Sequence, residues 1–163
     1  MLRDPLTYQL QLLYDTTHWC GATLITSRHA ISAAHCFSWN EFGPRDLSKY
    51  KVRSGVLYND GGDKETRSIK GIEKPFQGAW LWFKPDLVIL KLRRPFNLVE
   101  GLVQPACLPS KAVKHGDTCF TSGWGQTSFP EKTPSINLKV AKMKIKDRPW
   151  DCDNGNYLYE LNF

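Results

Sequence analysis

The chain has 163 residues, of which 41% are hydrophobic and 23% are charged. These fractions are typical of a globular protein and exclude a disordered, collagen-like or coiled-coil chain. No stretch reaches the roughly 18 consecutive apolar residues that a membrane-spanning helix needs, so we expect no membrane span. The net charge of +6 favours acidic partners such as sulfated glycans, anionic membrane surfaces or nucleic acid, but only weakly.

Short strands are predicted along the whole chain. Tyr8, Leu10, Leu12 and Tyr14 alternate with glutamines, a pattern that predicts a half-buried strand. The apolar run at residues 87–90 predicts a fully buried strand, and the Asn-Asp-Gly-Gly-Asp run at residues 59–63 predicts a turn. The predicted strands cover residues 8–14, 19–25, 50–58, 87–90, 118–122 and 138–145, with one short helix near residues 149–157. This pattern predicts an all-β fold, a barrel or a sandwich.

The five cysteines make an odd number. Cys20 and Cys36 are close enough in sequence for a disulfide to join them, whereas Cys107, Cys119 and Cys152 have no evident mates. No Cys-x-x-Cys pair occurs, so the common zinc spacings are absent and we expect no metal. The cysteines favour an oxidising compartment, although the first residues do not show a signal peptide.

The segment Ser32-Ala33-Ala34-His35-Cys36 carries the clearest chemical signal. A bridge to Cys20 would fix the backbone beside the imidazole of His35. The small residues before it allow close packing against another strand. A general base needs this rigidity, because its ring must point at a nucleophile within hydrogen-bond reach.

Five segments in order resemble the chymotrypsin/trypsin family of serine proteases. Residues 18–25 read His-Trp-Cys-Gly-Ala-Thr-Leu-Ile, residues 32–36 read Ser-Ala-Ala-His-Cys, and residues 86–92 read Asp-Leu-Val-Ile-Leu-Lys-Leu. Gln-Pro-Ala-Cys-Leu-Pro at 104–109 and Cys-Phe-Thr-Ser-Gly-Trp-Gly at 119–125 follow at the family's approximate spacing. The resemblance runs from about residue 5 to residue 152.

The resemblance implies a fold and two catalytic roles. It implies one trypsin-like peptidase domain over residues 1–163, a double β-barrel with the first barrel at 1–100 and an incomplete second barrel at 101–163. It implies that His35 is the general base and acid, and that Asp86 orients His35. The hydrophobic run after Asp86 predicts that its carboxylate is buried. Protein or peptide substrates, secretion and the absence of a cofactor are also implied.

The nucleophilic serine of such a triad is missing from the chain. The family carries it in a Gly-Asp-Ser-Gly-Gly segment, and no Gly-Asp-Ser-Gly occurs in these 163 residues. Gly-Asp-Thr-Cys at residues 116–119 is a decoy, because its threonine lacks flanking glycines. The mates that the family gives to Cys107, Cys119 and Cys152 would also lie outside the chain. We therefore expect a truncated sequence that is inactive as written.

A non-catalytic binding protein of the same fold, a pseudoprotease, is the alternative function. Lys142, Lys144 and Lys146 alternate with Met143 and Ile145, so a strand would place the three lysines on one face. Such a face is either simply solvated or a site for a sulfated glycan. The sequence contains no nucleic-acid-binding module, so we expect no nucleic acid partner.

Overall fold

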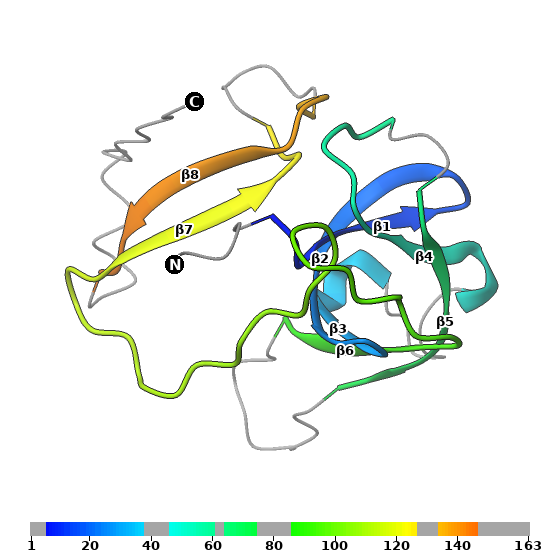
Figure 1. The fold of residues 1–163 in the computed structure, drawn as a ribbon, viewed down its shortest axis with the longest axis horizontal. Coiled ribbons are helices and arrows are strands. Elements are labelled where there is room, and N and C mark those ends of the chain that lie inside the picture. Colours follow the sequence, from blue (N-terminus) through cyan, green and yellow to red (C-terminus); the bar gives the residue numbers. More distant parts are fainter. Residues whose placement is uncertain (1–5, 38–45, 61–63, 75–85, 127–133, 147–163) are drawn as a thin grey trace. The chain divides into compact units, whose positions relative to one another are not determined.

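The computed structural model of the protein describes residues 6–37, 46–60, 64–74, 86–126 and 134–146 (Figure 1). The chain forms two compact units, Met1–Cys107 and Leu108–Phe163. The described residues form strands and two short 3₁₀ helices, so the all-β prediction is confirmed. No helix among them is long and apolar enough to cross a membrane. The helix predicted near residues 149–157 lies outside the described residues.

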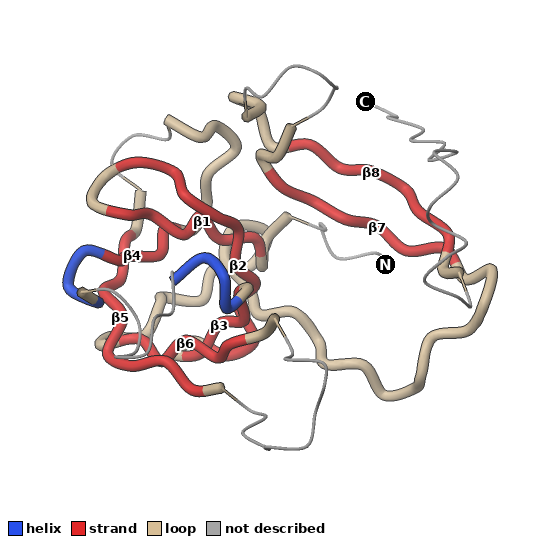
Figure 2. Tube along the Cα trace, turned by 180° about the vertical axis from the view of Figure 1, so that it is seen from behind, coloured by secondary structure: helices blue, strands red, loops and turns tan. Residues whose placement is uncertain are grey.

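The first unit is a closed barrel of six antiparallel strands. The strands neighbour one another in the order β1-β2-β3-β6-β5-β4, and β4 pairs with β1 to close the ring (Figure 2). Their bounds are β1 Gln9–Tyr14, β2 Thr17–Thr26, β3 His29–Ser32, β4 Tyr50–Arg53, β5 Thr66–Glu73 and β6 Val88–Leu92. The 3₁₀ helices are η1 Ala34–Phe37 and η2 Leu47–Lys49.

The core of the first unit lies inside this barrel. Alternate residues of each strand point inward, and Leu12, Leu24 and Leu90 are fully buried there. Phe96 and Val103, from the segment after β6, also belong to this core. The same segment is tied to the barrel because the Ala106 backbone N–H donates to the Leu24 carbonyl at 2.8 Å. The predicted domain boundary at residue 100 stays a prediction.

The sequence pattern missed two strands and overextended a third. β3 is only four residues long, and its inward residues, Ala30 and Ser32, are small. β5 has a bulge between Ile69 and Gly71, so its apolar residues do not alternate regularly. The strand predicted over residues 50–58 ends at Arg53 as β4, and Gly55 follows with a φ of 66°, a conformation that glycine adopts without strain.

Two predictions about burial were wrong. Gln9 and Gln11 of β1 are buried, with exposed fractions of 7% and 0%, although the alternating pattern predicted a half-buried strand. Gln11 is tolerated there because its side-chain amide donates to the Tyr58 carbonyl at 3.2 Å. The apolar run at residues 87–90 is buried on one face only, because Leu87 and Ile89 are half-buried.

The second unit contains an antiparallel two-stranded sheet. β7 (Thr118–Gly123) pairs with β8 (Lys139–Lys144) along its whole length. Trp124, directly after β7, is buried. At the other end of the sheet, the Gly116 N–H donates to the Ile145 carbonyl at 2.9 Å.

Candidate active site

His35 lies in η1, directly after β3. Its neighbour Cys36 forms a disulfide with Cys20 of β2, so the pairing that the sequence suggested is present. The Ser32 hydroxyl donates to the Gly21 carbonyl at 2.9 Å, which fastens the end of β3 to β2. The backbone that leads to the imidazole is therefore held on both sides.

Asp86 reaches His35 because of the register between β3 and β6. Ser32 lies opposite Val88 in this antiparallel pair. Ala34 is two residues after Ser32, and Asp86 is two residues before Val88, so these two residues also lie near each other. Residues that are 51 positions apart in sequence thus meet at one end of the barrel.

Two hydrogen bonds join His35 and Asp86. The Nδ1 atom of His35 lies 2.6 Å from Oδ2 of Asp86, and the His35 backbone N–H donates to Oδ1 at 2.8 Å. Because an ionised carboxylate only accepts, Nδ1 carries the proton in the neutral form of the ring, and Nε2 then has a free lone pair. These bonds, first of all the one from the His35 side chain, lower the pKa of Asp86.

The carboxylate of Asp86 is exposed, contrary to the prediction of burial. Its side chain is 53% exposed and that of His35 is 72% exposed in the structure. Asp86 stands two residues before β6 begins, and only the alternate residues of the strand itself point into the core. The apolar run after Asp86 therefore gave no information about the burial of its carboxylate.

Two neighbours that the sequence did not identify, Trp19 and Tyr50, hold the backbone beside His35. The indole N–H of Trp19 donates to the Cys36 carbonyl at 2.6 Å, and the Tyr50 hydroxyl donates to the same oxygen at 3.4 Å. The Trp19 ring also packs at a tilt against Tyr14, with ring centroids 6.1 Å apart. The sequence signal for Trp19 was its place in the family-like segment at residues 18–25, directly before Cys20.

Among the described residues, one group of potential metal ligands includes the same histidine. Donor atoms of Cys20, His35 and Cys36 all lie within 4.8 Å of one another, and Nε2 of His35 is 3.7 Å from the Cys36 sulfur. The two sulfurs share a disulfide, and metals bind the thiolate form. This cluster therefore offers only an imidazole.

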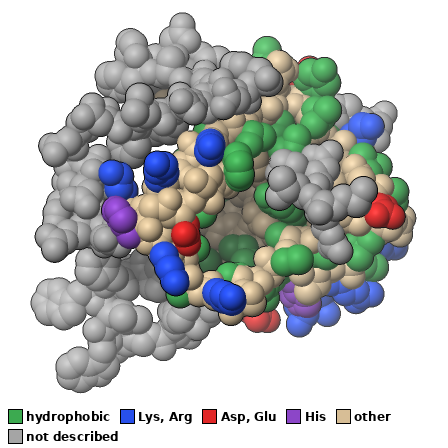
Figure 3. Space-filling model, turned by 60° about the vertical axis from the view of Figure 1, so that its left-hand side comes forward, with side chains coloured by type: hydrophobic (Ala, Val, Ile, Leu, Met, Phe, Trp, Pro, Cys, Tyr) green, Lys and Arg blue, Asp and Glu red, His purple; other side chains and the backbone are tan. Residues whose placement is uncertain are grey.

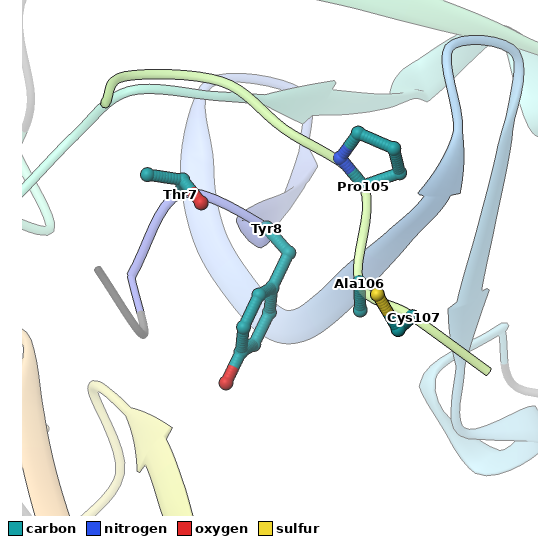
Figure 4. Close-up of a pocket in the computed structure, with 5 residues that line it drawn as sticks. All are labelled: Thr7, Tyr8, Pro105, Ala106 and Cys107. Carbon is teal, nitrogen blue, oxygen red and sulfur yellow. The ribbon is translucent and has the colours of Figure 1, made fainter. Parts of the chain in front are cut away.

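The remaining cysteines of the site prediction lie elsewhere. Cys107 is free and exposed, and Cys119 is free and half-buried in β7. Cys107 lies beside a pocket of about 250 Å³ that is also lined by Thr7, Tyr8, Pro105 and Ala106 (Figure 4). Cys152 lies outside the described residues.

The lysines of the predicted binding face are exposed. Lys142 and Lys144 lie on one face of β8, opposite Phe120 and Thr118 of β7. Lys146 follows the strand and is also exposed. Figure 3 shows Lys and Arg side chains gathered beside a histidine at two places on the face that it views.

Comparisons with known proteins identify the family of the chain. The trypsin family model matches residues 3–161. The chain is 32% identical over 146 residues to Trypsin-3 of Salmo salar, covering 85% of this chain and 56% of that protein. It is 32% identical over 113 residues to Serine protease 1 of Rattus norvegicus, covering 68% of this chain and 42% of that protein.

A solved structure shares the fold. A chain described as neuropsin, a serine protease expressed in the limbic system of mouse brain, matches with a TM-score of 0.70 and 23% identity. The match covers 89% of this chain and 62% of that chain. The chain spans about half the length of the curated relatives that it matches. It has a trypsin-like fold and belongs to the trypsin family of serine proteases.

Proposed function

We propose that this chain is part of a secreted serine endopeptidase that cleaves protein substrates, with His35 and Asp86 as two members of its catalytic triad. The observation that carries this proposal is the pair of hydrogen bonds from His35 to the two carboxylate oxygens of Asp86. The disulfide between Cys20 and Cys36 supports an oxidising, extracellular location.

The geometry suits the work of a general base. Asp86 accepts a hydrogen bond from Nδ1–H, so Nε2 is the atom that removes a proton from a nucleophile and later returns it to the leaving group. When Nε2 is protonated, the ring becomes a cation 2.6 Å from a carboxylate oxygen. The carboxylate stabilises this cation, which lowers the barrier to proton transfer.

The 163 residues alone lack the group on which this base would act. The sequence contains no Gly-Asp-Ser-Gly, the segment that supplies both the nucleophile and the oxyanion-hole amides in the family that the sequence resembles. A triad that loses one member keeps residual catalysis only through the oxyanion hole and substrate binding. We therefore propose that the chain as given does not hydrolyse peptide bonds at an enzymatic rate.

A fluorophosphonate probe, which labels activated serines, tests this proposal. We expect the 163-residue chain to stay unlabelled while a catalytically active trypsin labels under the same conditions. Stoichiometric labelling would contradict the proposal and would show an overlooked nucleophile. Thr118 and Ser122 would then be the first residues to substitute.

Sequencing the transcript past Phe163 tests the role of the pair. If Gly-Asp-Ser-Gly-Gly follows in frame, the longer protein should hydrolyse peptides. In it, Asp86→Asn should lower kcat roughly 10⁴-fold, because an amide favours the wrong tautomer of His35. An unchanged kcat would contradict the role given to Asp86. If no such segment follows, the longer protein should remain inactive.

A non-catalytic binding protein for sulfated glycans is the second candidate function. The observation that favours it is the exposure of Lys142, Lys144 and Lys146, two of them on one face of β8. Retention on a heparin column should fall when all three become Ser. Elution unchanged by this triple substitution would contradict glycan binding at β8.

A further inference from the structure

A second basic surface lies on the outer face of the first barrel. We call it the basic wall and define it as Lys51, Lys70, Lys91 and Arg93. All four side chains are exposed. They come from β4, β5 and β6 and the residue after β6, strands that lie side by side in both views (Figures 1 and 2).

The strand register explains why these residues share one face. Lys51 of β4 lies opposite Ser68 of β5, and Ser68 accepts a hydrogen bond through its carbonyl from the Arg93 N–H at 2.9 Å. Their strand neighbours Val52, Ile69 and Leu92 point into the core. Because side chains alternate across a strand, Lys51 and Arg93 point outward.

The next outward row brings a second set of cations. Lys91 of β6 lies opposite His29 of β3 and Gly71 of β5. Gly71 has no side chain to separate the charges, and the space outside it is open. Lys70, the bulged residue of β5, is exposed between the two rows. Arg28 and Arg94 are exposed at the margins.

The cations of the basic wall are closely spaced, and none of them forms a salt bridge with a carboxylate of the described residues. Neighbouring strands are about 4.8 Å apart and successive rows about 7 Å apart, so one linear anion can reach several cations. Among the described residues, the salt bridges are His35–Asp86 and Arg67–Glu65, and neither includes a wall residue. Glu73, opposite Ile89, is the acid on the following row. Clustered cations attract a polyanion more strongly than the same charges scattered.

We propose that the basic wall binds a sulfated glycan. The disulfide of the same barrel favours an extracellular polyanion over an intracellular one. The outward neighbours Ser68, Gly71 and Ile89 offer no aromatic ring on which the bases of a single-stranded nucleic acid could stack. The surface therefore recognises charge, which is what a sulfated glycan presents.

The wall is independent of the proposed catalytic pair. In the β3–β6 pairing, Lys91 lies opposite His29, and Val88 lies opposite Ser32. The two pairs are three residues apart along the strands, a distance of about 10 Å. His35 and Asp86 lie beyond the pair of Ser32 and Val88. A glycan on the wall would leave the pair accessible, and the failure of either proposal would leave the other standing.

Heparin-column elution of charge-matched variants of the 163-residue chain tests the proposal. One variant carries Lys70→Ser, Lys91→Ser and Arg93→Ser, and its control carries Lys64→Ser, Lys111→Ser and Lys114→Ser, exposed residues outside the wall. We expect the wall variant to bind heparin roughly tenfold or more weakly, since attraction depends on clustered charge, and the control to change much less. Equal losses would mean that only net charge matters and would overturn the proposal.

Two further measurements identify the ligand and guard against misfolding. We expect chemically desulfated heparin and single-stranded DNA to compete poorly with heparin for the parent chain. If the DNA competes as well as heparin, the assignment to a sulfated glycan is overturned. A variant with Lys70→Arg and Lys91→Arg keeps the charge and should retain parental binding, and circular dichroism checks the fold of each variant. A Ser variant that unfolds would be replaced by Lys70→Gln, Lys91→Gln and Arg93→Gln, and the same criteria would apply.

Discussion

The barrel of the first unit and the β7–β8 sheet of the second are both antiparallel, yet they bury their apolar side chains very differently. Leu12, Leu90 and Tyr50 are fully buried in the barrel. In the second unit, Phe120 and Ile136 are 61% and 62% exposed. Six strands that close on themselves enclose a core, whereas a sheet of only two strands cannot enclose one.

The comparison indicates that closing the strands into a barrel, more than merely forming strands, determines how much a unit contributes to the free energy of folding. Hydrophobic stabilisation is proportional to the apolar area removed from water. Among the described residues, every buried hydrophobic side chain except that of Trp124 belongs to the first unit. The pair His35–Asp86 is built entirely on the barrel, from the ends of β3 and β6. We therefore expect the geometry of the pair to depend on the barrel and not on β7 and β8.

The largest expected effect comes from matched truncations in the two units. Leu90→Ala should lower the free energy of unfolding by about 2–5 kcal/mol, since it leaves a cavity in the core. Phe120→Ala should change it by less than about 0.5 kcal/mol, as exposed sites usually do. Urea unfolding followed by tryptophan fluorescence measures both. Similar losses in the two variants would show that the β7–β8 sheet is packed like a core.

Removing the disulfide should have the next largest effect. Cys20→Ala together with Cys36→Ala should cost about 3 kcal/mol, because the bond closes a loop with a sequence separation of 16 and restricts the unfolded chain. Cys119→Ser in β7 removes a free thiol and serves as the control, with little expected change. Thermal unfolding compares the variants. If Cys119→Ser lowers the melting temperature as much as the double variant does, the contrast between the units fails.

The smallest expected effect is a pH dependence of the free energy of unfolding that arises from His18 of β2. Burial lowers the pKa of His18, in β2, from its ordinary value of 6.5. Below pH 6.5 the unfolded chain therefore binds a proton that the folded chain resists, and the free energy of unfolding should decrease as pH falls from 7 to 5. His18→Gln should flatten this slope.

Urea midpoints of the parent and His18→Gln at pH 7 and pH 5 measure the effect. The lowered pKa values of Asp46 and Asp86 affect the free energy of unfolding in a separate, lower pH range. Their contribution is present above about pH 4 and is lost as pH falls through the lowered values. An unchanged slope in His18→Gln would mean that His18 does not cause the loss of stability between pH 7 and pH 5.

Much of the site was predictable because its chemistry is written in local segments. Cys20, His35 and Asp86 each stand in a short motif, and the structure brings them together at one end of the barrel. Trp19 and Tyr50 were not predicted to support the site, since their hydrogen bonds to the Cys36 carbonyl join residues whose proximity depends on how β2 and β4 are arranged. The exposure of Asp86 was mispredicted because Asp86 precedes β6, and the apolar run of that strand gave no information about the carboxylate before it.

The sequence by itself determined the all-β class, most of the strands and the residues of the proposed catalytic pair, because alternation and short motifs are properties of neighbouring residues. Only the tertiary structure decided that β3 and β5 exist, that Gln11 is buried, and that Lys51, Lys91 and Arg93 share one outer face. A strand is stabilised by the partners on either side of it, and its register fixes which side chains meet. Those partners come from distant parts of the chain, so barrel closure determines both which residues form the core and which form the basic wall.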